Sequence, residues 1–420
     1  MIKIGRPTVR LRLGILLAAT LAVQVHGATP TDELSAEQLT SKAAALLRQG
    51  RDHAALYWLA EAERHGAEGV VLHYNRGVAQ QRLGQLEEAL EAFERARVAA
   101  PEAPQVLYGL ATTLQTADRH VEAVPLLQAA ARAAPRHSEI ALGLGQALAA
   151  SGRVEEALDA FALASALDFS AVEPVYQAGE LFLRQGDAAR AALHFSRAAE
   201  LDAGHAEARV GLGRARLLSG DAVGAVTVLE AAVALAPRNQ QAYYLLSDAC
   251  TKTGLHERRE QAMAAFRRLS ETARHLRQGV LLERQGKLEP ALQAWQRSVA
   301  ADSTNVKPLI LSGDALLRLG EEVAAGTAFA AALALSPGAV RARYGLGRVH
   351  FLAGRPEEAA AAFTRVLEQE PDHLDANYHA GLAATRLGRQ DAARRYLLRT
   401  LDVDPGHAQA RAALASIPAR

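Results

Sequence analysis

Apolar and small residues recur along most of this chain at steps of three and four positions, with polar residues between them. A clear example is the pair of segments VVLHYNRGVAQQRL, residues 70–83, and QLEEALEAFERARVAAP, residues 85–101, which flank Gly84. A period near 3.6 residues predicts amphipathic helices. The glycine predicts a short turn in which a left-handed residue ends the first helix. The sequence therefore predicts two helices joined at Gly84.

The same pair of helices repeats along the chain. Glycines recur with a period of about 34 residues in three runs: Gly50 and Gly84, then Gly152, Gly186, Gly220 and Gly254, then Gly286, Gly320, Gly354 and Gly388. Proline, which cannot continue a helix, closes many of the second helices, at Pro101, Pro135, Pro237, Pro337, Pro371 and Pro405. A fixed period of this length is the signature of a solenoid, and eleven units fit between residues 36 and 407.

Small residues at two fixed positions of each unit point to a known family. The middle of the first helix carries Ala43, Gly77, Ala111, Gly145, Gly179, Gly213, Ser247, Gly279, Gly313, Gly347 and Gly381. The start of the second helix carries Ala55, Ala89, Ala123, Ala157, Ala191, Ala225, Ala291, Ala325, Ala359 and Ala393. This pattern resembles the tetratricopeptide repeat. The resemblance implies an all-α, right-handed superhelical solenoid whose first helices line a concave inner surface.

The seventh unit, residues 240–271, departs from the pattern. It is two residues short, because Gly254 and Gly286 stand closer together than the other successive glycines, and Arg259 falls where alanine is expected. The stretch 257–277 is rich in arginine. One interpretation is a solvated helix face in an irregular stack, and the other is a bend with a basic patch at the joint. We therefore divide the array into residues 36–271 and 272–407, followed by a capping helix at 408–420.

Residues 1–27 have a different pattern. The first twelve residues include four basic side chains and are followed by an uncharged, mostly apolar run from Leu13 to Val25. Gly27 completes a cleavage site that suits signal peptidase. This arrangement is typical of a secretory signal peptide, and the run is shorter than the about 20 residues that span a bilayer. We expect residues 1–27 to be cleaved, residues 28–35 to form a short linker, and the protein to be periplasmic. The alternative is an uncleaved anchor in the inner membrane that faces the periplasm.

Composition and charge narrow the possible functions. The 47 basic and 46 acidic residues nearly cancel, so no net positive field favours nucleic acid as a partner. The single cysteine, Cys250, excludes an intramolecular disulfide framework and a thiolate zinc site. No Walker, HExxH or GxSxG motif occurs, and histidines such as His137 and His205 lie in different units, too far apart to share a metal ion. We expect no enzyme activity, no cofactor and no metal site.

Two positions of the first helix carry side chains that are suited to binding. Six tyrosines, here called the tyrosine ladder, occupy one position: Tyr74, Tyr108, Tyr176, Tyr244, Tyr344 and Tyr378. Eight residues further along, the basic ladder consists of Arg48, Arg82, Arg184, Lys252, Arg284, Arg318 and Arg386. Residues eight apart project to a similar side of a helix, and the resemblance places both ladders on the inner surface. We predict a partner-binding groove here, although the tyrosines could instead pack between neighbouring units.

These features favour two binding functions. The first is a protein–protein interaction scaffold of the bacterial cell envelope, in which envelope proteins bind in the concave groove. The alternative is a carbohydrate-binding factor in exopolysaccharide export that works with a separate outer-membrane protein, because tyrosine rings can stack on sugars. A receptor for C-terminal carboxylates is not predicted, since Asn75 matches one position of that clamp while Val78 and Thr112 replace its partners.

Overall fold

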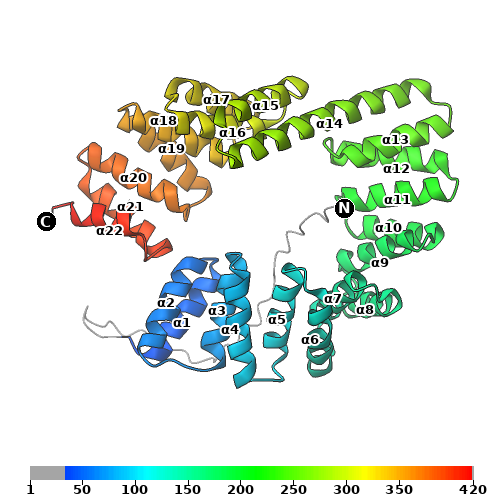
Figure 1. Cartoon of the computed structure of the whole chain (residues 1–420), viewed down its shortest axis with the longest axis horizontal. Coiled ribbons are helices and arrows are strands. Elements are labelled where there is room, and N and C mark those ends of the chain that lie inside the picture. Colours follow the sequence, from blue (N-terminus) through cyan, green and yellow to red (C-terminus); the bar gives the residue numbers. More distant parts are fainter. Residues whose placement is uncertain (1–33, 419–420) are drawn as a thin grey trace. The chain divides into compact units, whose positions relative to one another are not determined.

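The structure is a computed structural model that describes residues 34–418, and every regular element in this range is an α-helix (Figure 1). The all-α class predicted from the periodicity is confirmed. The predicted signal peptide, residues 1–27, and residues 28–33 of the expected linker lie outside the described residues. None of the described helices combines the length and the apolar character needed to cross a membrane.

The chain divides into two compact units between residues 167 and 168. The described part of the first unit consists of four repeats, each with a first and a second helix. These are α1 (Ala36–Arg48) with α2 (Asp52–Arg64), α3 (Val70–Arg82) with α4 (Leu86–Ala99), α5 (Pro104–Thr116) with α6 (His120–Ala133), and α7 (Ser138–Ala150) with α8 (Val154–Leu167).

The second unit begins with two regular repeats, α9 (Val172–Arg184) with α10 (Ala188–Leu201) and α11 (Ala206–Leu218) with α12 (Ala222–Leu235). Three helices follow that do not form regular pairs: α13 (Gln240–Lys252), the long helix α14 (His256–Arg284) and α15 (Leu288–Ala301). The regular pattern resumes with α16 (Val306–Leu319) and α17 (Glu322–Leu335), α18 (Val340–Leu352) and α19 (Pro356–Gln369), and α20 (Leu374–Arg386) and α21 (Gln390–Val403). The predicted capping helix is α22 (Ala408–Ala415).

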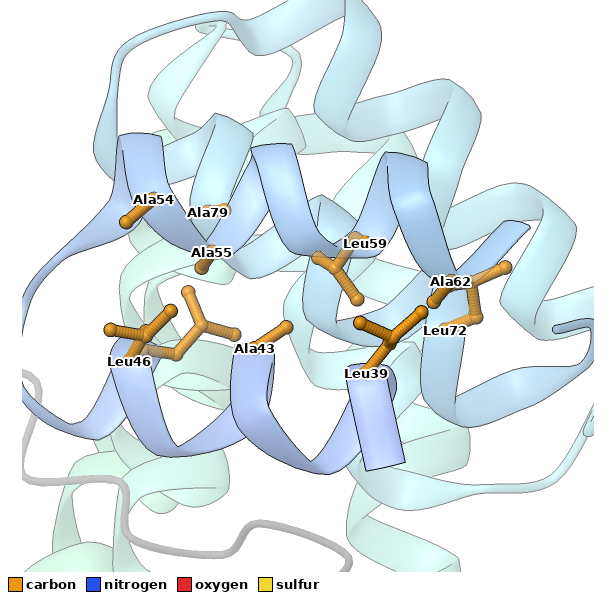
Figure 2. Close-up of a cluster of buried hydrophobic side chains, with 10 residues drawn as sticks. Leu39, Ala43, Leu46, Ala54, Ala55, Leu59, Ala62, Leu72 and Ala79 are labelled. Atoms are coloured by element: carbon orange, nitrogen blue, oxygen red, sulfur yellow. The ribbon is translucent and has the colours of Figure 1, made fainter. Parts of the chain in front are cut away.

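Alanine and leucine build the core where the first three helices meet. Ala43 of α1 and both Ala55 and Leu59 of α2 are fully buried, and Leu72 of α3 is only 1% exposed. Figure 2 shows these side chains between the helices. Because each alanine carries only a methyl group, the two helices of the repeat approach closely and the leucines fill the remaining space. Part of this core is contributed by α3, so each repeat depends on its neighbour for burial of apolar surface.

Phenylalanine rings fill the space between one repeat and the next. Phe329 of α17 is fully buried, with Gly313 of α16 and Gly345 of α18 against its ring. A Cβ atom added to these glycines would lie 2.6 Å and 2.4 Å from ring carbons, so a larger residue would have to displace the ring. Phe93 and Phe195 are held between pairs of glycines in the same way. Small residues of the first helices thus leave room for the rings that join one repeat to the next.

Turns within the repeats use the left-handed backbone conformation. Gly320, for example, ends α16 with a φ of 78°. In the third repeat the residue at this place is Asp118, with a φ of 64°. Aspartate tolerates this conformation better than most residues because its short side chain bonds to nearby backbone groups. The turn therefore keeps its geometry where the run of glycines is interrupted.

The long helix α14 replaces both the second helix of the seventh repeat and the first helix of the eighth (Figure 1). At several of the regular connections a proline separates such helices, and at some of them a side chain caps the following helix. Before α13 these are Pro237 and Asn239, whose side chain accepts a hydrogen bond from the backbone N–H of Ala242. Residues 256–284 contain no proline, and the hydroxyl of Thr272 donates to the carbonyl of Arg268 inside the helix instead of capping a new one, so the helix continues. The helix runs through residue 271, where the sequence analysis divided the array, and the two compact units are divided between residues 167 and 168.

Candidate partner-binding surface

The first helices of neighbouring repeats contact each other in a row. In the first unit α1 contacts α3, α3 contacts α5, and α5 contacts α7. In the second unit the same holds for α9 and α11, α11 and α13, α16 and α18, and α18 and α20. No contact of comparable extent joins second helices in the described part of the chain. The first helices therefore form an inner row in each unit, which is interrupted at α14, and both ladders lie on these helices except for Arg284 at the end of α14.

The tyrosine ladder lies on six of these first helices: Tyr74 on α3, Tyr108 on α5, Tyr176 on α9, Tyr244 on α13, Tyr344 on α18 and Tyr378 on α20. All but Tyr244 are half-buried. The ring centroids of Tyr74, Tyr176 and Tyr344 lie 5.8, 5.6 and 5.8 Å from those of Phe93, Phe195 and Phe363, each in the same repeat as its tyrosine. Burial raises the pKa of Tyr108 to about 12 and also raises the pKa values of Tyr74, Tyr176 and Tyr344. The rings of Tyr74, Tyr176 and Tyr344 therefore pack against the second helix of their own repeat, whereas the alternative that the sequence left open was packing between neighbouring units.

Histidines at the start of the following repeat pack against three of the tyrosines. The centroid distances are 5.0 Å for Tyr176 and His205, 5.2 Å for Tyr344 and His373, and 4.9 Å for Tyr378 and His407. In each of these histidines Nδ1 accepts a hydrogen bond from a backbone N–H three residues later, at 3.0 to 3.2 Å. Each one therefore caps a helix and covers a tyrosine. The sequence analysis missed this role, although all three histidines stand at the same offset from their tyrosines and directly before a first helix.

Tyr244 is the exception because the next first helix has no separate start. In the seventh repeat the residues that would form an N-cap lie inside α14, so no histidine covers the ring. Tyr244 is 54% exposed, and its ring centroid lies 5.6 Å from that of Phe266 on α14. Of the six ladder tyrosines, it offers the largest accessible face.

The aromatic packing is densest around His379 of α20. The centroid of its ring lies 5.7, 5.7 and 5.2 Å from those of Tyr344, Phe363 and Tyr378. Its Nδ1 atom donates to the backbone carbonyl of Asp375 at 2.8 Å. Burial lowers the pKa of this imidazole below its ordinary value, with the hydrogen bond to the Asp375 backbone acting in the opposite direction.

Part of the basic ladder joins neighbouring repeats. Arg82 donates from Nη1 to the carbonyl oxygen of Leu47 at 2.7 Å, and Arg386 donates in the same way to Phe351 at 2.7 Å. Each acceptor lies near the end of the first helix one repeat earlier, where carbonyl groups lack helical partners. Arg318 forms the equivalent link through the side chain of Glu283, at 2.9 Å. These three residues therefore stabilise the stack as well as lining the inner row.

The remaining ladder positions present accessible side chains. Arg48, Arg184 and Arg284 are exposed, and Lys252 has its ammonium group 3.3 Å from Asp248 in the same helix. Two repeats carry leucine at the basic position, Leu218 on α11 and Leu352 on α18, and these are 61% and 52% exposed. The accessible part of the inner row is thus a mixture of cationic and apolar side chains.

Between residues 34 and 418 no three histidine, cysteine, aspartate or glutamate side chains gather closely enough to hold a metal ion. Cys250 is buried, and this burial raises the pKa of its thiol. A raised pKa keeps the sulfur protonated, which disfavours nucleophilic chemistry. Asn75, the residue that matched one position of a carboxylate clamp, is buried as well.

The repeats match known family models over most of the array. A tetratricopeptide-repeat model matches residues 74–136, 176–239, 276–340, 310–373 and 344–408, and a second tetratricopeptide-repeat model matches residues 114–178. The chain belongs to the tetratricopeptide-repeat family. The matches of this tetratricopeptide-repeat protein stop at residue 239 and resume at 276, so they omit α13 and residues 256–275 of α14. No curated protein matches its sequence.

Among solved structures, this tetratricopeptide-repeat protein is similar to MamA from Desulfovibrio magneticus RS-1, with 26% identity, 40% of this chain and 96% of that chain covered, and a TM-score of 0.39. It is also similar to YrrB, described as a TPR protein with an unusual peptide-binding site, with 22% identity, coverage of 44% and 96%, and a TM-score of 0.40. The match to the Cut9–Hcn1 structure covers 92% of this chain and 84% of that chain, with 15% identity and a TM-score of 0.36.

Proposed function

We propose that this tetratricopeptide-repeat protein is a non-catalytic interaction scaffold of the bacterial cell envelope, and that it binds segments of partner proteins along the inner row. Proteins of this family are generally scaffolds that bind peptides or other proteins. The observation that carries the proposal is the set of accessible side chains at the two ladder positions of the first helices, which combines cations with exposed apolar residues.

This surface suits a protein segment for a physical reason. Leu218, Tyr244 and Leu352 offer apolar area that a partner can remove from water, which is the main source of affinity in such contacts. Arg184 and Lys252 offer donors for carboxylates and backbone carbonyls. Packed helices hold the backbone of all five residues, so binding has to order only their side chains.

A carbohydrate ligand is less well supported. Stacking on a sugar requires an accessible flat ring face. Five of the six ladder tyrosines are half-buried, and the rings of Tyr74, Tyr176, Tyr344 and Tyr378 lie against phenylalanine or histidine rings. Only Tyr244 among the ladder residues presents a largely exposed ring, and one such ring is a weak platform for a polysaccharide.

The envelope setting of the proposal is based on the N-terminal pattern of residues 1–27. We propose that this segment directs export and is removed before Ala28. Determination of the N-terminal sequence of the protein recovered from a cell-envelope fraction tests this part. A start at Ala28 in the periplasmic fraction is the expected result, and an intact Met1 in a cytoplasmic fraction contradicts it.

Crosslinking in intact cells, followed by mass spectrometry of the captured proteins, tests the scaffold. The variant Leu218→Ala/Tyr244→Ala should lose defined partners that the unmodified protein captures. The matched control is Val121→Ala/Val323→Ala, which removes exposed apolar side chains from the second helices α6 and α17. Equal capture by all three proteins, or equal loss in the control, would show that the inner row is not the binding surface.

A further inference from the structure

The long helix α14 carries a line of arginines on one face. Arg267, Arg274, Arg277 and Arg284 are exposed and recur at steps of seven, three and seven residues, so they share one side of the helix. The half-buried Met263 and the 57% exposed Leu281 lie on the same side. We call this face the arginine stripe. It extends about 25 Å along the helix axis from the first arginine to the last.

The stripe is uncovered because the repeat pattern fails here. Arg277 occupies the repeat position that Gly345 occupies in α18, where the ring of Phe329 from the preceding repeat packs against the glycine. In α14 the preceding second helix and this first helix are one continuous rod, so they cannot pack on each other. Extensive contacts of α14 in the described part of the chain are with α13 and α15. Leu269, Thr272 and Gly279, which are buried, make up the covered side of the helix.

The charge of the stripe is not neutralised within the molecule. Several exposed arginines elsewhere pair with carboxylates one turn away, as Arg119 does with Glu122 and Arg153 with Glu156. In the described part of the chain no ion pair engages Arg267, Arg277 or Arg284, and Arg274 lies 3.2 Å from Nε2 of His275. A row of unpaired cations on a protein whose total charge is close to zero is a local feature that an anionic partner can recognise.

We propose that the arginine stripe docks an acidic amphipathic helix of a partner protein. Glutamate or aspartate at steps of three and four residues would face the guanidinium groups, whose forked donors match carboxylates. Two apolar residues of the partner, about 27 Å apart along its axis, would cover Met263 and Leu281. Two copies of this chain would repel each other through the same face. A phosphate backbone would leave the apolar side chains in water, so a protein helix fits better than a nucleic acid or a lipid surface.

Fluorescence anisotropy with the full-length protein tests the proposal. The probe is a labelled helical peptide in which glutamate and leucine recur at alternating steps of three and four residues, and the reference peptide has glutamine for glutamate. The variant Arg267→Ala/Arg274→Ala/Arg277→Ala should bind the glutamate peptide about tenfold more weakly or worse. The matched control, Arg64→Ala/Arg197→Ala/Arg341→Ala, removes three exposed but ion-paired arginines and should bind as the unmodified protein does.

Hydrogen exchange of the unmodified protein is a second measurement, and it does not depend on the folding of a variant. The bound peptide should protect the backbone amides of residues 263–284 from exchange. Absence of binding, equal binding of the glutamine peptide, or equal loss in the control overturns the proposal. Stripe-dependent binding of phosphatidylserine vesicles or of a DNA duplex, without binding of the peptide, also overturns it.

The stripe shares only Arg284 with the basic ladder, and the variants that test the two proposals leave Arg284 unchanged. The variant Arg184→Ala/Leu218→Ala should keep the affinity for the glutamate peptide, and the stripe variant should keep the partners that crosslink to the inner row. Failure of either proposal alone is therefore recognisable.

Discussion

Arg277 in α14 and Gly345 in α18 stand at the same position of the repeat, yet their surroundings are opposite. Gly345 is pressed against the ring of Phe329, which is fully buried between two repeats. Arg277 is exposed to solvent on an uncovered face. The comparison shows that the side chain this position accommodates depends on whether a ring from the preceding repeat lies against it.

The cause of the difference lies outside the position itself. The step from Gly254 to Gly286 is two residues short, and the segment between them contains no proline to end a helix. Once the helix continues, the ring position of the seventh repeat, Met263, can no longer reach the following first helix. A change of two residues in a connection thus converts a packed interface into a charged surface.

The test with the largest expected effect removes the buried ring. Phe329→Ala should lower the free energy of unfolding by about 3–5 kcal/mol, because it leaves a cavity between two repeats. Met263→Ala, at the equivalent position, should cost only about 1 kcal/mol, because Met263 is half-buried and no following helix packs on it. Urea denaturation followed by circular dichroism measures both. Equal losses would mean that α14 is packed as tightly as a regular repeat.

The second test adds a methyl group at the shared position. Gly345→Ala would bring a Cβ atom to 2.4 Å from Phe329 and should destabilise the protein by about 1–3 kcal/mol. Arg277→Ala should change stability by about 0.5 kcal/mol at most. Gly326→Ala is the control for helix propensity, because its Cβ atom would lie at an ordinary 3.4 Å from Val349. That variant should be neutral or slightly stabilising, and a loss comparable to that of Gly345→Ala would contradict the steric explanation.

The regular repeats could be predicted from the sequence because local signals determine them. Glycine spacing, closing prolines and small residues in the helices each act within one repeat or between adjacent ones. The long helix was missed for a different reason. The two-residue deficit was visible, but the absence of proline between residues 256 and 284 also had to be considered.

The candidate site could be predicted only in part. The sequence located both ladders on first helices, and the structure has them there. The solvent exposure of each tyrosine could not be predicted from the pattern. It depends on a phenylalanine of the second helix and a histidine of the next repeat, as Tyr176 shows with Phe195 and His205. Contacts of this kind are set by the stacking of repeats and not by the helix that carries the tyrosine.

The third test compares two tyrosines of the same ladder. Tyr176→Ala should destabilise the protein by about 2 kcal/mol, since the ring packs on both Phe195 and His205. Tyr244→Ala should cost about 0.5 kcal/mol, because the interruption at α14 leaves its ring exposed. Thermal denaturation of the two variants measures the difference. A larger loss for Tyr244→Ala would show that its ring is structural and would remove it from the proposed binding surface.

The smallest expected effect concerns a third residue at the shared position, His379, which faces Phe363 where Gly345 faces Phe329. Burial lowers the pKa of His379 below its ordinary 6.5, so the folded state disfavours the protonated ring. The unfolded chain then binds more protons, and stability should fall as the pH drops below 6.5 towards the lowered pKa. His379→Gln keeps a polar side chain that does not titrate, so this variant should lose less stability over the same interval. Urea denaturation at a series of pH values measures the two slopes, and equal slopes would mean that the imidazole is protonated as easily in the folded protein as in the unfolded chain.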